Sequence, residues 1–468
     1  MNTQLRIDSL TVSNFRCFES LTIDFHPNLT VLVARNGQGK TAILDAVKVS
    51  LGTFTRAFPH SVSATFSKYD ARITEQGILP EPTYPVSVDA TGYIDNEVCS
   101  WSREKTKPDG VTSIGKTKSL IAYGERLYNH FLLMQQSDLP FEDLSQKKED
   151  IDLPVLAYYS IYRLWTDEKI KDKEGKKYSP LTESRFYAYE YAFFKHQNYG
   201  NLKQWLKTAL LFTRYSKTAQ IESRGVAITN QLEAVTSALS SVLEKEGVYD
   251  IEFDYSTFDL CALIEKHNKN NSQKDIADSL ALPVSKLSDG VRGMFAMVAD
   301  IAWRCAKLNP HFGKDACKKT YGIVLIDEVD LCLHPAWQQR IIGDLQRTFP
   351  NIQFIVTTHS PQVVSSVPRE CVRIIEDGEV LPADIQTQGV ESQDILARIF
   401  GTSPAPKNDP YVQKLQEYAK MEAAGQADSE KGKVLYQELA QHFGEQYPPL
   451  QMIEIHRKFI AKRSKSDA

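Results

Sequence analysis

The stretch VLVARNGQGKT, residues 31–41, contains the residue types that bind a nucleotide polyphosphate. An apolar run leads into a loop of small residues and then a helix-forming sequence, which is the order of a phosphate-binding loop. Glycines let backbone N–H groups approach phosphates, a lysine can reach the β- and γ-phosphates, and a threonine hydroxyl can bind Mg²⁺. Ala34 stands where the pattern usually has its first glycine, and an ordinary glycine-rich turn is the alternative. The residues expected to bind the nucleotide are Asn36, Gly37, Gln38, Gly39, Lys40 and Thr41.

Two later apolar runs end in side chains that would complete such a site. GIVLIDEVD, residues 322–330, ends in two carboxylates. We expect Asp327 to bind Mg²⁺ together with Thr41, and Glu328 to orient or deprotonate the attacking water. IQFIVTTHSP, residues 352–361, leads to His359, which is placed to contact the γ-phosphate. Each run alone is weak, but their order after the phosphate loop favours an ATPase.

A third segment, LSDGVRG at residues 287–293, precedes a helix-like stretch, and its Ser288 and Gly290 resemble the signature loop of ATP-binding-cassette proteins. With NFRCF at 14–18 and DEVDLCLHP at 327–335, it makes the chain similar to the ABC-type ATPase heads of the SMC/RecF group. The resemblance implies an α/β fold. It would have a mixed β-sheet core with the phosphate loop, N-terminal antiparallel strands, a largely helical insertion and a helical C-terminal tail.

The resemblance also implies how such a head works. ATP and Mg²⁺ would bind between two copies of the chain, with Ser288 and Gly290 of one copy contacting the γ-phosphate held by the other. His359 would sense that phosphate, and Glu328 would set how long the closed dimer lasts. Arg16 would contact the nucleotide as well, with an ordinary surface arginine as the alternative.

Within this group, the chain resembles the PtuA-type ATPases of Septu and retron anti-phage systems. The resemblance rests on ARNGQGKTAILDAV, on the compact insertion and on the DILARIFGT segment near the C-terminus. It implies a partner HNH nuclease and, in retron versions, a reverse transcriptase with its RNA–DNA product. Neither a Toprim-like acidic set nor an HNH-like metal cluster is visible in the sequence, so a nuclease would be another chain.

Two other functions stay open from the sequence. One is a RecF-like DNA repair ATPase, whose central activity would be DNA binding. The other is a scaffold that ATP locks as a dimer with little turnover. Tight, salt-sensitive binding to duplex DNA would favour the first. Good ATP binding with almost no hydrolysis would favour the second.

The motif positions predict four parts along the chain. Residues 1–104 and 281–385 would form the two lobes of the ATPase head, 105–280 a mostly helical insertion, and 386–468 a helical tail for partner docking. Patterns within these parts predict further elements: a hairpin over 86–104, a core strand within 152–165 followed by Arg163, and a hairpin in VRIIEDGEVL. Two or three polar helices are expected after 411. Gln135–Gln136 is one candidate for a Q-loop.

Three segments of the insertion have competing interpretations. The apolar seam at 228, 232, 235, 239 and 242 predicts a helix packed on its own domain, or a short helical arm. The lysine-rich KIKDKEGKK, residues 169–177, could contact nucleic acid or be a solvated loop. The aromatic and cationic stretch 185–205 could stack on bases or form a helix-packing face.

Composition restricts the class of protein. The chain has 468 residues, 42% of them apolar and 24% charged, which is ordinary for a globular protein. No run reaches the roughly 18 apolar residues of a membrane helix, and the N-terminus lacks a secretory pattern. The 7 cysteines form no C-x-x-C pair, so neither a zinc site nor a disulfide framework is indicated. We expect a cytoplasmic protein without membrane contact, and a net charge of −4 allows only a local nucleic-acid surface.

Overall fold

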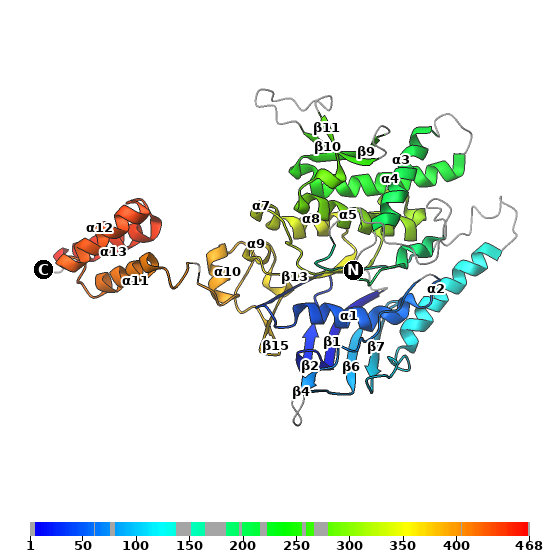
Figure 1. Ribbon diagram of the computed structural model, residues 1–468, viewed down its shortest axis with the longest axis horizontal. Helices are drawn as coiled ribbons and strands as arrows, with labels where there is room; N and C mark the ends of the chain where they lie inside the picture. Colours follow the sequence, from blue (N-terminus) through cyan, green and yellow to red (C-terminus); the bar gives the residue numbers. More distant parts are fainter. Residues whose placement is uncertain are drawn as a thin grey trace. The chain divides into compact units, whose positions relative to one another are not determined.

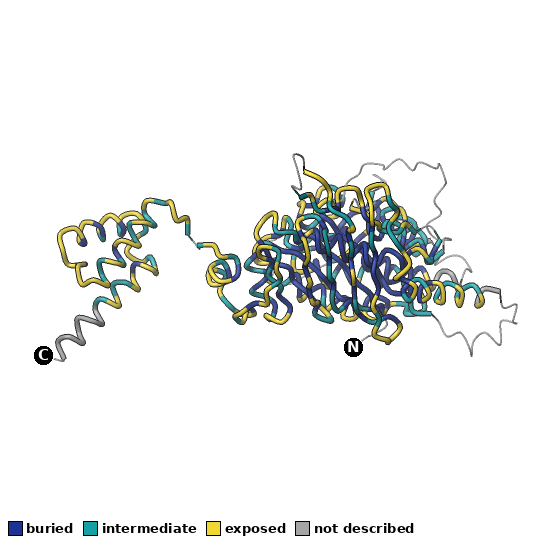
Figure 2. Tube along the Cα trace, turned by 90° about the horizontal axis from the view of Figure 1, so that it is seen from below, coloured by how far each residue is buried: buried dark blue, intermediate teal, exposed yellow. Residues whose placement is uncertain are grey.

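The computed structural model describes residues 5–59, 61–74, 80–136, 151–163, 184–195, 199–215, 222–254, 259–265, 279–403 and 405–466. The chain divides into two compact units, Met1–Ser392 and Gln393–Ala468. Among the described residues, no helix is both long enough and apolar enough to cross a membrane. The larger unit contains every predicted nucleotide-site residue. Its buried residues lie mainly in its centre (Figure 2).

A six-stranded sheet forms the core of the larger unit, in the order β15-β14-β3-β13-β12-β8 (Figure 1). All neighbours pair in parallel except the β14–β15 hairpin, which the EDG turn predicted. Strands β3, β13, β12 and β8 are buried along their whole length, which explains why their sequences are continuous apolar runs. The strands are β3 Leu29–Ala34, β8 Val155–Tyr159, β12 Gly322–Ile326, β13 Ile352–Thr358, β14 Val372–Glu376 and β15 Glu379–Pro382.

A second, antiparallel sheet is built mainly by the N-terminal residues, in the order β2-β1-β6-β7. Its last two strands are the hairpin predicted over 86–104, and Asp95 and Asn96 at the turn both have positive φ. Two such residues suit the type I′ turn that joins twisted strands. The bounds are β1 Leu5–Phe15, β2 Phe18–Asp24, β6 Val86–Ile94 and β7 Glu97–Lys105, with the two-stranded pair β4 Ile73–Thr74 and β5 Glu81–Pro82 beside them in sequence.

Helices of the larger unit cover these sheets. The predicted seam on α4 is confirmed as a packing face: Val235 and Val242 are fully buried, and α4 packs against α5. The short-arm interpretation is therefore not needed for these residues. The helices are α1 Lys40–Thr55, α2 Lys118–Gln136, α3 Tyr199–Tyr215, α4 Glu222–Leu243, α5 Asp289–Leu308, α6 Ala316–Lys319, α7 Pro335–Gln338, α8 Ile341–Thr348 and α9 Pro361–Val364.

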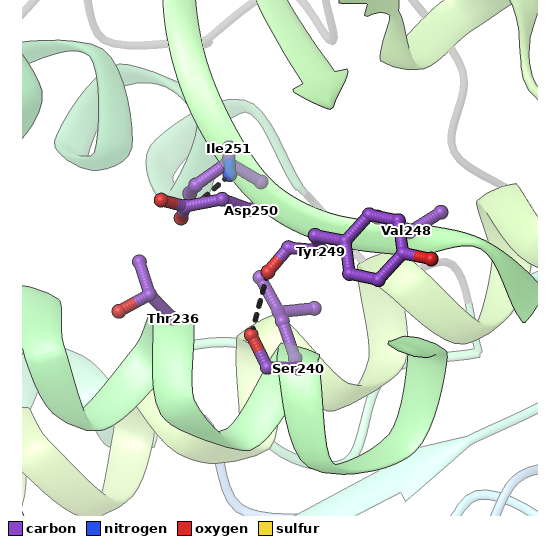
Figure 3. A pocket seen from close by; sticks show the side chains of 7 residues that line it. Thr236, Ser240, Val248, Tyr249, Asp250 and Ile251 are labelled. Carbon is purple, nitrogen blue, oxygen red and sulfur yellow. Dashed lines mark hydrogen bonds between the residues drawn. The ribbon is translucent and has the colours of Figure 1, made fainter. Parts of the chain in front are cut away.

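The insertion contains a sheet as well as helices. Strands β9 Val248–Asp254, β10 Asp259–Glu265 and β11 Ser279–Pro283 form an antiparallel sheet in the order β11-β10-β9. The Ser240 hydroxyl of α4 donates a 2.8 Å hydrogen bond to the Tyr249 carbonyl, which closes the crevice between helix and strand (Figure 3). That crevice is a packing seam with no room for a ligand.

The aromatic stretch of the insertion belongs largely to the core. Phe186 and Tyr189, in the 3₁₀ turn η1 (Arg185–Tyr189), are each 1% exposed and both stack on Phe58. Trp205 on α3 is also buried. These rings are closed off from bases, as the helix-packing interpretation predicted. The lysine-rich loop 169–177 and the side chains of Gln135–Gln136 lie outside the described residues.

The smaller unit consists of helices, as predicted for the tail. They are α10 Ser392–Arg398, whose first residue is the last of the larger unit, and α11 Pro410–Ala423, α12 Glu430–Phe443 and α13 Pro448–Ser466. Its core is small and centres on Tyr418, Leu435, Leu439 and Leu450. Asp409 begins α11 by accepting hydrogen bonds from the N–H groups of residues 411 and 412, a normal capping arrangement.

Candidate nucleotide-binding site

The phosphate loop joins the end of β3 to the start of α1, as predicted. Gly37 and Gly39 have φ values of +83° and +93°, a region that suits glycine. Gly39 is also a close-approach position, since a Cβ there would lie 2.3 Å from the Phe18 ring and 2.7 Å from the Cys17 sulfur. The NFRCF turn therefore packs directly on the end of the loop. Ala34 is the last residue of β3 and is not among the positive-φ positions, which explains why a glycine is unnecessary there.

The Lys40 ammonium is bound to the loop's own carbonyls. Its Nζ donates to the Ala34 carbonyl at 2.9 Å and to the Arg35 carbonyl at 3.4 Å. Burial lowers the pKa of Lys40, and the charges of Asp327, Glu328 and Asp330 oppose that shift. The lysine is thus a buried cation facing a group of carboxylates, and an anion could take over the place of the carbonyls.

Thr41 and Asp327 meet although 286 residues separate them. The Thr41 hydroxyl donates to the Asp327 carboxylate at 3.0 Å and 3.2 Å. Asp327 is 3% exposed and accepts a further 2.7 Å bond from the Thr357 hydroxyl. A hydroxyl and a carboxylate are oxygen donors of the kind that Mg²⁺ prefers, so these two residues fit a magnesium ion with nucleotide phosphates as its other ligands.

Glu328 follows directly and has a φ of +49°, unusual for a residue that is not glycine. Its N–H donates to the Thr357 hydroxyl at 2.7 Å. On the other side, the buried Arg163 donates to the carbonyls of Asp327 and Glu328, both at 2.5 Å. From the sequence, Arg163 is named only as the arginine that follows the core strand and is assigned no role.

His359 follows the end of β13 and is partly buried. Burial and the nearby Lys40 charge lower the pKa of His359, while Glu328, Asp330 and Asp327 act in the opposite direction. The histidine therefore shares one electrostatic environment with the phosphate-loop lysine and the acidic residues. Just before it, the Thr358 hydroxyl donates to the Asp330 carboxylate at 2.5 Å, which ties β13 to the segment after Glu328.

The other predicted loop residues face outward. Asn36 and Gly37 are exposed, and no neighbouring atom lies within 4 Å of a Cβ built on Gly37. The Gln38 side chain instead points to the β14–β15 turn, where its Oε1 accepts a 3.1 Å bond from the Asp377 N–H. The Gln38 side chain is consequently bound to the hairpin, so only the Gln38 backbone is available to contact a phosphate.

Arg16 is held by carboxylates rather than standing free on the surface. Its Nη2 lies 2.6 Å from Asp45 on α1 and 2.8 Å from Asp70, and these two charges oppose the effect of burial and raise the pKa of Arg16. Asp45 also pairs with Lys48. This network fastens the NFRCF turn to the helix of the phosphate loop. The surface-arginine alternative does not describe it.

Ser288 and Gly290 start the signature helix α5. Ser288 is exposed and occupies the N-cap position of α5, but its side chain makes no capping hydrogen bond. Gly290 is buried, and a Cβ there would lie 2.3 Å from the Cys332 carbonyl. The helix start therefore packs on the segment after Glu328 through Gly290, while Ser288 is exposed.

Comparison with known proteins places this arrangement in a family. A family model described as an AAA domain matches residues 9–279, more than half of the chain. The chain belongs to the AAA domain family. This AAA-domain chain is 28% identical to the "Retron Ec83 probable ATPase" of Escherichia coli, over 94% of the chain and 84% of that relative. It is 26% identical to the "Retron Vc95 probable ATPase" of Vibrio cholerae, over 94% of the chain and 88% of that relative.

A shorter match links the chain to a Septu system. It is 37% identical to the "Septu protein PtuA" of Bacillus mycoides over 23% of the chain and 14% of that protein. The resemblance to ATPases of retron and Septu systems is thereby confirmed. Among solved structures, an SMC head bound to the C-winged helix domain of ScpA aligns with a TM-score of 0.43, at 16% identity, over 81% of this chain and 98% of that one. This score is low, and the fold assignment rests on the strand order and the phosphate loop described above.

Proposed function

We propose that the chain binds and hydrolyses ATP with Mg²⁺ at the loop between β3 and α1. The observation that carries this proposal is the bond between the Thr41 hydroxyl and the Asp327 carboxylate. When bound, Mg²⁺ would neutralise charge on the β- and γ-phosphates. Thr41 and Asp327 would hold it, and Lys40 would exchange its two carbonyl partners for phosphate oxygens. The N–H groups at the start of α1 would add further stabilisation of the anion.

Glu328 and His359 would act on the γ-phosphate side of the site. Glu328 is the carboxylate next to the metal ligand, so it would orient the attacking water and accept its proton. His359, kept largely neutral by burial and by Lys40, would donate a hydrogen bond to the γ-phosphate. Loss of that phosphate after hydrolysis would remove the contact, and the histidine would thus report which nucleotide is bound.

The ATP-bound form would be a dimer of two such chains. In each site, the start of α5 from one copy, with the exposed Ser288 and the buried Gly290 next to it, would close over the γ-phosphate held by the other copy. The γ-phosphate then supplies the differential affinity between open and closed forms. Hydrolysis would weaken the dimer, and slow chemistry at Glu328 would prolong it.

The biological role that fits best is anti-phage defence. The two relatives described above that span most of the chain are each named a retron probable ATPase, and the Septu match adds a second defence system. The chain would control a partner HNH nuclease, with a reverse transcriptase and its RNA–DNA product as further partners in a retron. The helical unit 393–468 is the part we assign to docking of that partner.

Mg²⁺-dependent release of phosphate from ATP tests the proposal. We expect turnover by the purified chain, its loss in Thr41→Ala, and roughly 100-fold slower turnover with ATP binding retained in Glu328→Gln. Thr22→Ala is a matched control, because Thr22 also bonds through its hydroxyl but to Thr11 on the N-terminal sheet. Absence of turnover by the wild-type chain despite ATP binding would favour the scaffold function instead.

A further inference from the structure

Arg163 is a buried cation whose observed partners are backbone carbonyls. Its side chain is 2% exposed, and its Nη1 donates to the Asp327 and Ser160 carbonyls while its Nη2 donates to the Glu328 carbonyl. Among the described residues, no carboxylate forms an ion pair with it. A planar guanidinium presents its donors in a fixed fork, so it orients the groups that it binds.

The two carbonyls on this fork belong to successive residues, and that is informative about the backbone. Along an extended strand, successive carbonyls point to opposite sides. The carbonyls of Asp327 and Glu328 can reach one guanidinium only because Glu328 leaves the strand conformation, at a φ of +49°. A residue other than glycine is held in this region only when its surroundings favour it. Arg163, which lies just after β8, stabilises this backbone conformation by donating to both carbonyls.

Thr357 acts from the opposite side. Its hydroxyl accepts the Glu328 N–H at 2.7 Å and donates to the Asp327 carboxylate at 2.7 Å. The peptide groups on both sides of Glu328 are therefore fixed by β8 through Arg163 and by β13 through Thr357. With its backbone set in this way, the direction in which the Glu328 side chain leaves the strand end is set as well.

We propose that Arg163 is a positioning residue for Glu328, which aims this carboxylate at the attacking water through the two carbonyls. The inference rests on the proposed function, because it assigns Glu328 the role given above. Arg163 would act through the backbone of Glu328 and not on the nucleotide directly. Its loss would leave Lys40, Thr41 and Asp327 to bind the nucleotide, but would let the backbone of Glu328 relax and its carboxylate turn away.

The position of Arg163 depends in turn on the insertion. The carbonyl of Ser160 accepts from Arg163 at 3.2 Å, and the Ser160 hydroxyl donates to the Lys195 carbonyl. Lys195 belongs to the segment that follows the 3₁₀ turn η1, so this segment, Ser160, Arg163 and Glu328 form one hydrogen-bonded series.

The test compares Arg163→Lys with Arg103→Lys. Arg103 is a matched control, because it is 1% exposed and also donates to backbone carbonyls, those of Val49 and Ala64, in the N-terminal part of the unit. We expect Arg163→Lys to lower kcat roughly 10- to 100-fold while the Kd for Mg-ATP changes less than twofold. Arg103→Lys should keep both. Thermal unfolding of each variant shows that it is folded.

The decisive arm is a double variant. If Arg163 acts through Glu328, then adding Arg163→Lys to Glu328→Gln should change single-turnover hydrolysis less than twofold, since the group being aimed is already gone. Three results would overturn the inference. Arg163→Lys could keep the wild-type kcat, or its Kd for Mg-ATP could rise as many fold as its kcat falls. The double variant could also hydrolyse ATP more slowly than Glu328→Gln by the same factor by which Arg163→Lys alone is slower than the wild type. Normal turnover in Glu328→Gln would instead overturn the proposed role of Glu328. The two failures are thus distinguishable.

Discussion

The Thr41 hydroxyl bonds to the Asp327 carboxylate at 3.0 Å, and this contact joins the phosphate loop to the acidic end of β12. It exists because β13 alone separates β3 from β12 in the sheet, so the carboxyl ends of these strands lie at one edge. Ligands of open α/β sheets bind at that edge. The phosphate loop and the acidic end of β12 therefore form one candidate site.

Lys40→Ala should abolish nucleotide binding. The variant removes a buried cation that the bound phosphates would neutralise. We expect the Kd for Mg-ATP to rise at least about 100-fold, which corresponds to about 2.7 kcal/mol. Titration with a fluorescent ATP analogue measures it. Lys68→Ala, which removes a lysine stacked on Tyr69 in the same unit, should bind normally. Tight binding by Lys40→Ala would show that the loop is misassigned.

The two positive-φ glycines of the loop should differ in their tolerance of a methyl group. Gly37→Ala meets no neighbour within 4 Å, so it should cost only the conformational term of about 1–2 kcal/mol. Gly39→Ala adds a collision with Phe18 and Cys17. We expect its loss in the free energy of unfolding to exceed that of Gly37→Ala by at least about 1 kcal/mol. Urea denaturation compares them, and equal losses would mean that the NFRCF turn does not press on Gly39.

His359 should titrate below the ordinary histidine range. Burial, aided by Lys40, lowers its pKa, so the folded chain holds it neutral where the unfolded chain still protonates it. Its contribution to stability is therefore present above the unfolded pKa of about 6.5 and is lost as pH falls through the folded pKa. NMR of the imidazole measures the pKa, which should rise when Mg-ATP brings a γ-phosphate beside the ring. An unchanged pKa on nucleotide binding would remove His359 from the site.

The sequence predicted the segments that meet at the candidate site because each of them is local. The apolar runs of β3, β12 and β13 are buried on both faces, so each can be recognised as a buried strand from its own sequence. The contacts of Arg163 and Arg16 could not be predicted in this way. The Arg163 contacts depend on β8 lying beside β12, and Arg16 depends on Asp70 reaching the NFRCF turn. Strands β9–β11 were not among the expected elements, because they are only 5 to 7 residues long and their sheet is formed by pairing with one another.

Complementation between two inactive variants tests the central claim most directly. If each site takes Lys40 from one copy and Ser288 from the other, then Lys40→Ala and Ser288→Arg should each be inactive alone, while a mixed dimer has one intact site. Random mixing at equal amounts makes half of the dimers mixed, so ATP turnover should recover to about a quarter of the wild-type rate. Ser100→Arg, at an exposed strand position, should be active alone. A mixture no more active than its separate components, or full activity of Ser288→Arg by itself, would contradict an ATP site shared between two chains.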